Sequence, residues 1–138
     1  MFYTARLTKD DVCGYTVDFP DLDGCFTEGD TLEEALAMAK EAMELTLCDV
    51  FDGCPLPEAK TKPDPKKGLY AVEVSPSLSI ALQMVAARGK KTQRQMANEM
   101  GMHLQAYQRL ENPDSNLSVR MLERIAGHLG KRLEVRLV

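Results

Sequence analysis

The sequence predicts an α+β protein in which a small antiparallel sheet with one helix precedes an all-α domain that ends in a strand. Apolar and polar residues alternate in the first part of the chain, which is typical of strands, and recur at helical spacing after residue 76. Charge divides the chain at the same place. Residues 1–75 hold 7 Lys or Arg against 16 Asp or Glu, a net charge of −9, and residues 76–138 hold 10 against 5, a net charge of +5. We therefore expect two domains, 1–75 and 76–138.

The first domain opens with two alternating segments, residues 1–8 and 12–19, around a short polar turn. Two such segments predict an antiparallel hairpin. Residues 20–24 then break the second strand, because they include a proline and a glycine. Residues 25–28 are expected to form a short third strand.

A helix is predicted to begin at Thr31, because Thr31 and Glu34 have the spacing of a capping box. It should end by Asp52-Gly53. Its apolar residues recur at helical spacing: Leu32, Leu36, Ala39, Met43, Leu47 and Val50. Residues 53–68, which contain four prolines, are expected to be an irregular surface loop. Residues 69–74 alternate again and predict the last strand of the sheet.

The second domain is predicted to contain four helices. The first carries Leu78 and Val85, and the second begins at Thr92 and ends before Gly101. The third spans about residues 104–111, and the fourth begins at Ser118 and ends at Gly130. Residues 132–138 alternate and predict a terminal strand.

The two short helices that meet at Gly101 predict a helix-turn-helix for DNA. Ala97 is small enough for the helices to cross closely, and glycine permits the left-handed turn between them. Thr92 and Gln93 begin the first of the pair, where N–H groups and short polar side chains hold a phosphate. Gln and Arg side chains read adenine and guanine bidentately in the major groove. The remaining DNA-contacting residues are therefore expected on the outward face of the second helix: His103, Leu104, Gln105, Gln108, Arg109 and Asn112.

The stretch from Thr92 to Asn112, with the later Leu122-x-x-Ile125-Ala126-x-x-Leu129-Gly130, resembles the Xre/lambda-repressor class of helix-turn-helix. The resemblance implies that Gln93 clamps a phosphate, that Gln105 and Arg109 are the principal base readers, and that Glu111 is a structural carboxylate. His103 departs from the usual Ser or Thr cap. Leu104 is apolar where many relatives are polar, so it either touches a thymine methyl or is buried.

The segment from Tyr15 to Ala35, with Phe19-Pro20-Asp21-Leu22 and Gly29-Asp30-Thr31 at its centre, is similar to the hallmark of HicB antitoxins. The resemblance implies a partial ribonuclease H-like fold and a partner, HicA, that is a small basic RNA-cleaving toxin. It also implies that the protein represses its own operon. An acidic domain can occupy the basic face of such a toxin in place of RNA phosphates. The expected toxin-contacting residues are Glu28, Asp30, Glu33, Glu34, Glu41 and Glu44.

Two other functions compete with this interpretation. Asp18, Asp21, Asp23 and Asp30 could bind Mg²⁺ for nuclease chemistry, although aspartates in such positions more often end strands and cap helices. We therefore expect no enzyme activity and no catalytic residue. Alternatively, the protein is a one-component repressor whose first domain senses a small ligand.

The four cysteines, Cys13, Cys25, Cys48 and Cys54, form no C-x-x-C pair, and the chain has only two histidines. We expect reduced structural thiols, no metal site and no cofactor. No apolar run is long enough to cross a membrane, and residues 1–6 lack the start of a signal peptide. The sequence thus favours a cytoplasmic protein.

A homodimer or a higher oligomer is expected, held through residues 115–138. Two copies of a helix-turn-helix one DNA turn apart multiply affinity and specificity. A lone strand at 132–138 leaves its backbone groups unpaired, and pairing with its copy across a two-fold axis would satisfy them. The alternative is that this strand joins the sheet of its own chain.

Overall fold

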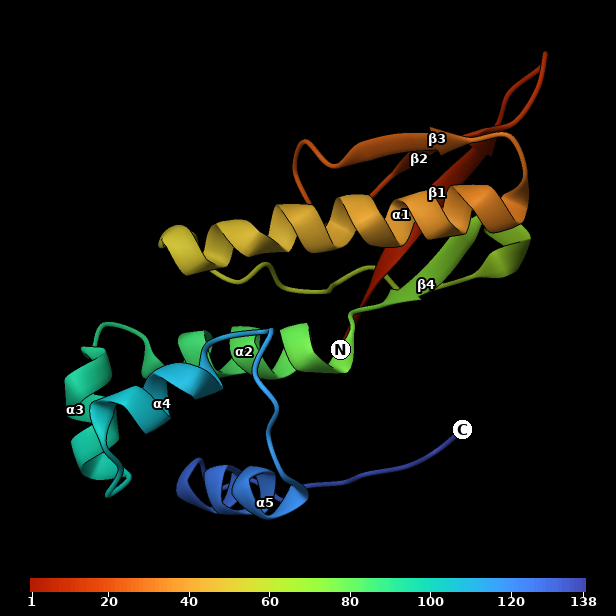
Figure 1. Cartoon of the computed structure of the whole chain (residues 1–138). Coiled ribbons are helices and arrows are strands. Elements are labelled where there is room, and N and C mark those ends of the chain that lie inside the picture. Colours follow the sequence, from red (N-terminus) through yellow and green to blue (C-terminus); the bar gives the residue numbers. More distant parts are fainter.

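The computed structural model describes residues 1–138 and consists of a sheet unit and a helical unit (Figure 1). The sheet unit contains β1 (Phe2–Lys9), β2 (Tyr15–Asp18), β3 (Phe26–Gly29), α1 (Leu32–Leu47), the short 3-10 helices η1 (Cys48–Asp52) and η2 (Pro65–Lys67), and β4 (Leu69–Glu73). The helical unit contains α2 (Pro76–Arg88), α3 (Gln93–Glu99), α4 (Leu104–Leu110) and α5 (Val119–His128). The predicted α+β class is confirmed, and so is the predicted order of elements from β1 to α5.

The four strands form one antiparallel sheet in the order β3-β2-β1-β4. In β1, Arg6 lies opposite Asp18 of β2 and opposite Leu69 of β4. Tyr3 and Leu7 of β1 are buried in the core shared with α1. Because side chains alternate along a strand, Arg6 points to the face of the sheet that α1 does not cover.

Helix α1 begins where the sequence predicts. The Thr31 side chain accepts a hydrogen bond from the Glu34 backbone N–H at 3.1 Å, and Glu34 Oε2 accepts one from the Asp30 N–H at 3.2 Å. The small buried residues Ala35 and Ala39 let α1 lie close to the sheet. Gly29 of β3 permits this approach, since a methyl group there would overlap the backbone of Ala35.

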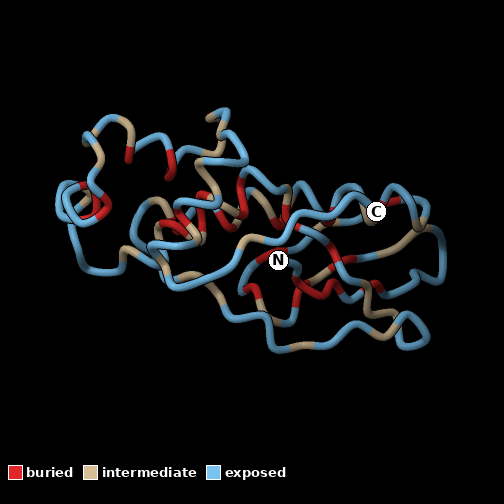
Figure 2. The backbone as a smooth tube through the Cα atoms, turned by 90° about the horizontal axis from the view of Figure 1, so that it is seen from below, coloured by how far each residue is buried: buried red, intermediate tan, exposed pale blue.

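Helix α2 belongs to two cores at once. Leu78 and Leu82 pack into the core of the sheet unit, whereas Met84 packs into the core of the helical unit. Figure 1 shows α2 between the sheet layer and the remaining helices. The buried stretches lie inside the molecule, and the connecting loops are exposed (Figure 2). A boundary at residue 75 remains a prediction, but a cut there would remove two leucines from the first core.

The segment between η1 and η2 is irregular, as predicted, yet it is tied to the sheet. Asp21 Oδ2 accepts hydrogen bonds from the Lys60 N–H at 2.9 Å and the Thr61 N–H at 2.7 Å, and its Oδ1 accepts one from the Thr61 hydroxyl at 3.0 Å. The Thr4 hydroxyl donates to the Thr61 carbonyl at 2.7 Å. Thr4 is buried and alternates with Tyr3 and Ala5, so this segment crosses the face of the sheet that is opposite α1.

The predicted terminal strand is wrong for the chain on its own. Residues 131–138 have no regular structure, and β3 and β4 keep the two edges of the sheet. The alternative that this segment joins the sheet of its own chain is therefore wrong as well. Alternation of apolar residues creates a strand only where a neighbouring backbone supplies hydrogen bonds. Here Val135 and Leu137 are exposed, Leu137 almost completely, at 98%.

Candidate DNA-binding and partner-binding surfaces

The turn between α3 and α4 has the geometry of a helix-turn-helix. Gly101 adopts φ +64°, in the left-handed region, and the Met102 N–H donates to the Ala97 carbonyl at 2.8 Å. Both helices hold their inner faces against α2 and α5 through one small core. Its buried members are Met84, Met96, Ala97, Met100, Tyr107, Leu110 and Ile125. The sequence had identified Ala97 and the turn glycine from local spacing alone.

The expected base readers, Gln105 and Arg109, lie together with the flanking Gln108 on the outer face of α4. Gln105, Gln108 and Arg109 are exposed, on a helix whose opposite face buries Tyr107 and Leu110. Side chains on that outer face are able to enter a groove of DNA while α2 and α5 hold the helix from behind.

The three other predicted DNA contacts on or next to α4 differ in exposure and in hydrogen bonding. His103 occupies the N-cap of α4 without a side-chain capping hydrogen bond, and is exposed. Leu104 is half-buried, between the two situations that the sequence left open. Asn112 is exposed, and its Oδ1 accepts a hydrogen bond from the Asp114 N–H at 2.9 Å, so it also shapes the loop after α4.

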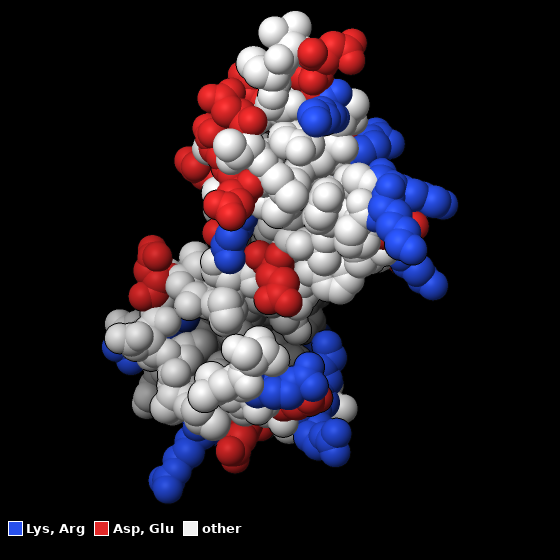
Figure 3. Space-filling model, turned by 90° about the vertical axis from the view of Figure 1, so that its right-hand side faces the viewer, with Lys and Arg blue, Asp and Glu red and all other residues white.

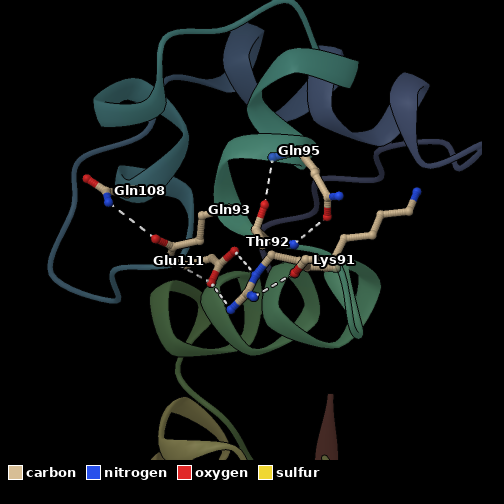
Figure 4. A network of polar contacts seen from close by, with 7 residues as sticks. Lys91, Thr92, Gln93, Gln95, Gln108 and Glu111 are labelled. Atoms are coloured by element: carbon tan, nitrogen blue, oxygen red, sulfur yellow. Dashed lines mark hydrogen bonds and ion pairs between the residues drawn. The ribbon is translucent and has the colours of Figure 1, made fainter.

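A chain of polar contacts fixes α4 relative to α2 and α3 (Figure 4). Arg88 at the end of α2 donates from Nε and Nη2 to the two carboxylate oxygens of Glu111, at 2.9 and 3.1 Å. Gln93 Nε2 also donates to Glu111, at 3.2 Å, and Gln93 Oε1 accepts from Gln108 Nε2 at 3.2 Å. The proposed phosphate clamp, Gln93, is thereby joined to the outer face of α4.

Burial makes this ion pair a structural feature. The Glu111 side chain is 5% exposed and that of Arg88 is 23% exposed. The hydrogen bonds from Arg88 to Glu111 raise the pKa of Arg88, so its charge is secure. The Tyr107 hydroxyl is buried nearby with no hydrogen-bond partner, and burial together with the Glu111 carboxylate raises its pKa. The structural role inferred for Glu111 is confirmed, whereas its partner Arg88 was missed by the sequence analysis.

Thr92 begins α3 with a reciprocal cap. Its hydroxyl accepts from the Gln95 N–H at 3.1 Å, and Gln95 Oε1 accepts from the Thr92 N–H at 2.8 Å. Arg88 Nη1 donates to the carbonyl of the preceding Lys91 at 2.9 Å. A second missed residue, Arg124 of α5, donates to the Met100 carbonyl at 3.2 Å. The sequence offered only indirect signals for these arginines. Glu111 was expected to be a structural carboxylate, which needs a donor, and the carbonyl groups at helix ends also need donors.

The acidic residues predicted to bind a partner form a stripe along one side of the sheet unit. Figure 3 shows most of the Asp and Glu residues of this unit on one side and most of its Lys and Arg residues on the other. Glu28, Asp30 and Glu34 line a hollow of about 540 Å³ beside the start of α1, together with Asp10, Cys13, Tyr15 and Met38. Glu33 and Glu41 are exposed further along α1. The six residues thus do not converge on one point.

Two of the six acids have structural partners. Glu34 accepts the Asp30 N–H, as described above, and Glu44 accepts the Ser75 N–H at 2.7 Å. Glu44 thereby fixes the connection between β4 and α2 relative to α1. The outer face of α1 also exposes two apolar side chains that the sequence analysis did not single out, Met38 at 38% and Leu45 at 74%.

The aspartates considered for a nuclease site do not form one cluster. Asp18 binds Arg6 through two hydrogen bonds, at 2.6 and 3.0 Å, and Asp21 holds Lys60 and Thr61. No group of three or more His, Cys, Asp or Glu side chains lies close enough to hold a metal ion. No helix is both long enough and apolar enough to cross a membrane.

All four cysteines are free thiols, of which only Cys25 is buried. Burial raises the pKa of Cys25, and partial burial together with the carboxylates of Asp49 and Glu44 raises the pKa of Cys48. Because the thiolate is the reactive form, these two thiols are poor nucleophiles at neutral pH.

The fold and these surfaces define a helix-turn-helix protein with an acidic sheet unit at its N-terminal side. The model of the HicB-like antitoxins of bacterial toxin–antitoxin systems matches residues 3–108, and a helix-turn-helix model matches residues 82–135. The chain belongs to this HicB-like antitoxin family.

Two similar proteins are named as HicB antitoxins. Antitoxin HicB 2 of Photorhabdus laumondii subsp. laumondii is 30% identical over 98% of this chain and 95% of its own length. Antitoxin HicB of Escherichia coli (strain K12) is 29% identical over the whole of both chains. A solved structure titled HicA3 and HicB3 toxin-antitoxin complex covers 55% of this chain and all of its own matched chain, with 32% identity and a TM-score of 0.45.

Proposed function

We propose that this protein neutralises a basic, HicA-like RNA-cleaving toxin by direct binding and represses its own operon by binding operator DNA. The observation that carries the proposal is the separation of two surfaces on one chain. The helical unit presents Gln105 and Arg109 on a helix fixed by the Arg88–Glu111 pair, whereas the sheet unit presents exposed carboxylates along α1. Because the protein binds operator DNA, it acts in the cytoplasm. The protein acts by binding, without a cofactor and without catalysis.

In the DNA complex, α4 lies in the major groove. Arg109 donates to the O6 and N7 of a guanine, and Gln105 pairs with an adenine. Thr92 and Gln93 approach a phosphate at the start of α3. The contact from Gln93 to Gln108 holds the phosphate clamp and the outer face of α4 in one arrangement before DNA arrives, which lowers the entropic cost of binding. The remaining contacts come from His103, Leu104, Gln108 and Asn112.

Gel shifts with the DNA upstream of the gene test this proposal. Arg109→Ala and Gln105→Ala should each weaken operator binding by about 1–3 kcal/mol and relax specificity at one base pair. Gln93→Ala should weaken binding to all sequences alike, because a phosphate contact carries no sequence information. Lys40→Ala removes a charge from the sheet unit and serves as the control. Unchanged operator binding by both α4 variants, with an intact circular dichroism spectrum, would contradict the proposal.

In the toxin complex, the acidic stripe covers the basic face with which the toxin binds RNA. Glu28, Asp30, Glu33 and Glu41 supply exposed charge, whereas Glu34 and Glu44 keep α1 in place. Met38 and Leu45 add apolar contacts inside the charged stripe, where interfaces concentrate their binding energy. Charge guides the association, and the apolar contacts slow dissociation.

Co-purification with the product of the neighbouring gene tests this binding. The fragment should include α2, residues 1–89, because Leu78 and Leu82 complete the core of the sheet unit. We expect it to bind the toxin and to rescue growth. Leu45→Asp should weaken the complex more than Glu33→Gln. A folded fragment that neither co-purifies nor rescues would contradict the proposal, and Mg²⁺-dependent ribonuclease activity of the pure chain would favour an enzyme.

We further propose that residues 115–138 join two copies of the chain. The segment 132–138 supplies backbone groups without partners and the exposed Val135 and Leu137, which a two-fold related copy would cover. Deletion of residues 132–138 should give a monomer in light scattering that binds a single half-site weakly. If this variant stays dimeric and binds the operator normally, the interface lies elsewhere.

A further inference from the structure

The sheet unit has a net negative charge, yet most of its cations lie on one side. Five of its seven Lys and Arg residues belong to this group: Arg6, Lys60, Lys62, Lys66 and Lys67. The Thr61 carbonyl accepts a hydrogen bond from Thr4 at 2.7 Å, and the Gly68 carbonyl accepts one from the Leu7 N–H at 2.8 Å. Both ends of the lysine-bearing segment therefore lie against β1. Figure 3 shows the resulting group of basic residues on the side of the unit away from the acidic stripe.

Internal ion pairs do not account for this grouping. Lys62, Lys66 and Lys67 have no carboxylate within 4.0 Å, and Lys60 reaches only Glu58, at 3.9 Å, with both side chains more than 70% exposed. Like charges in one place repel one another, so an isolated chain gains nothing from this arrangement. The segment is also held in place, because Asp21 accepts hydrogen bonds from Lys60 and Thr61. Arg6 pairs with Asp18, but the ordered lysines beside it lack close internal partners, and such a group is suited to an anionic ligand.

The adjoining face of the sheet carries an exposed aromatic ring. Phe26 of β3 lies opposite Asp18, Asp18 lies opposite Arg6, and Arg6 lies opposite Leu69. These residues therefore form one row across the face that α1 leaves uncovered, and the row ends beside Gly68 and the lysines. Phe26 is 73% exposed. With strands about 4.8 Å apart, the row from Phe26 to β4 spans roughly 14 Å.

The surroundings of Phe26 favour a nucleic acid over a protein as the ligand. Thr16, Asp18 and Glu28 are its neighbours on this face, so the ring is isolated among polar groups. Protein interfaces instead gather apolar residues at their centre. Single aromatic rings beside a cationic path are typical of sites for single-stranded nucleic acids, whose bases stack on the ring while phosphates follow the cations. A double helix keeps its bases stacked inside and would leave Phe26 unused.

We propose that the face of the sheet opposite α1, beside the segment that crosses it at Thr4, binds single-stranded nucleic acid. A base stacks on Phe26, and phosphates contact Lys62, Lys66 and Lys67. Glu28 on β3 and Glu73 on β4 repel phosphates at the two ends of this face, whereas Asp18, within the Phe26–Arg6 row, is paired with Arg6, so the strand runs across the sheet along this row. This site is separate from α4 and borders the acidic stripe at Glu28, and it does not depend on the function proposed above.

A single tryptophan can report on the stacking directly. The chain contains no tryptophan, so Phe26→Trp introduces one fluorophore at the proposed site. Titration of this full-length variant with 12-nucleotide RNA and DNA of mixed sequence should quench its fluorescence to saturation. Leu45→Trp, exposed on the acidic side, is the matched control and should not be quenched. A preference for RNA over DNA would show contacts to the 2′-hydroxyl. Absence of quenching in the Phe26→Trp variant with both oligonucleotides would overturn the proposal.

Anisotropy of a labelled 12-nucleotide RNA tests the cations and the ring separately. Phe26→Leu should weaken binding by about 5- to 100-fold, because it removes stacking but keeps an apolar side chain. Combined Lys62→Gln, Lys66→Gln and Lys67→Gln should reduce the slope of log affinity against log salt by about 2, which is three contacts at about 0.7 each. Lys90→Gln, Arg120→Gln and Lys131→Gln remove equal charge from the helical unit and should leave the slope unchanged.

The two triple variants also separate the competing explanations. Equal losses in both would locate RNA binding in the helical unit and overturn the proposal. If the lysine triple variant binds RNA normally but loses the toxin in co-purification, the basic group is a protein-binding surface, which also overturns it. Circular dichroism and urea midpoints equal to those of the unmodified chain ensure that a loss reports on binding.

Discussion

The sheet unit and the helical unit hold their functional side chains in different ways. The core of the sheet unit contains 16 buried apolar residues, 14 from the unit itself and two from α2, whereas the core of the helical unit contains only 7, so the helical unit depends more on individual polar contacts. In the first, charged groups lie mostly at the surface and are available to partners. In the second, the buried Arg88–Glu111 pair sets the position of the helix that would read DNA. A small core that must present one helix accurately therefore uses directional bonds where a larger core uses packing.

Helix α2 is where the two units meet, and its two faces should respond differently to truncation. Leu82 is fully buried in the first core, and Met84 is 1% exposed in the second. Leu82→Ala and Met84→Ala should each lower the free energy of unfolding by about 2–5 kcal/mol. Amide hydrogen exchange should rise mainly in β1 and β4 for Leu82→Ala, and mainly in α3 and α4 for Met84→Ala. Equal loosening of both units by each variant would show that the two cores unfold as one.

Loss of the buried ion pair should mainly affect the helical unit. Arg88→Ala leaves the Glu111 carboxylate buried without its cation, which we expect to lower the free energy of unfolding by about 3 kcal/mol. Operator affinity should fall too, although Arg88 is not among the predicted DNA contacts. Arg88→Lys keeps the charge but not the two-pronged geometry, and it should recover stability only in part. Urea midpoints and gel shifts measure the two effects, and an unchanged midpoint for Arg88→Ala would contradict the role given to the pair.

Substitutions at two glycines separate the cost of a steric overlap from the cost of a left-handed backbone conformation. Gly29→Ala places a methyl against the backbone of α1, so we expect a loss of about 1–3 kcal/mol in unfolding free energy. Gly101→Ala meets no steric obstacle but must keep φ at +64°, which costs about 1 kcal/mol. Thermal unfolding of both variants measures the difference. A larger loss at Gly101 than at Gly29 would show that the turn is the more constrained of the two.

The smallest expected effect is a pH dependence of the sheet unit. Partial burial acts to raise the pKa of Asp21, but the hydrogen bonds from Thr61 and Lys60 outweigh it and lower the pKa. The stabilisation is therefore fully present above the ordinary aspartate pKa of about 3.9, and it is lost as the pH falls through the lowered value. Asp21→Ala should cost about 1 kcal/mol at pH 7 and should flatten the loss of stability in acid. Urea unfolding between pH 2 and 7, in about five steps, compares the two chains. If the free energy of unfolding falls with pH in the same way for both chains, the stabilising role given to Asp21 is wrong.

Much of the fold follows from patterns within a few residues of one another. The capping spacing of Thr31 and Glu34 located the start of α1, and the glycine at 101 located the turn between α3 and α4. Strand alternation located β1, β2 and β4, and a short strand was expected near β3; the largest error is at the start of β2. The outward placement of Gln105 and Arg109 followed from helical periodicity. Their role in binding DNA, like that of the acidic stripe in binding a toxin, remains a prediction.

By itself, the sequence determined the order of the elements, the caps and turns, and the face of α4 that points outward, because each depends on hydrogen bonds and side-chain spacing within one or two turns of chain. Only the tertiary structure decided which distant groups meet. It paired Arg88 with Glu111, joined Asp21 to Thr61, divided α2 between two cores, and left residues 132–138 without a backbone partner. These contacts join residues far apart in the chain, and no local pattern encodes them, because burial and pairing depend on how whole elements pack.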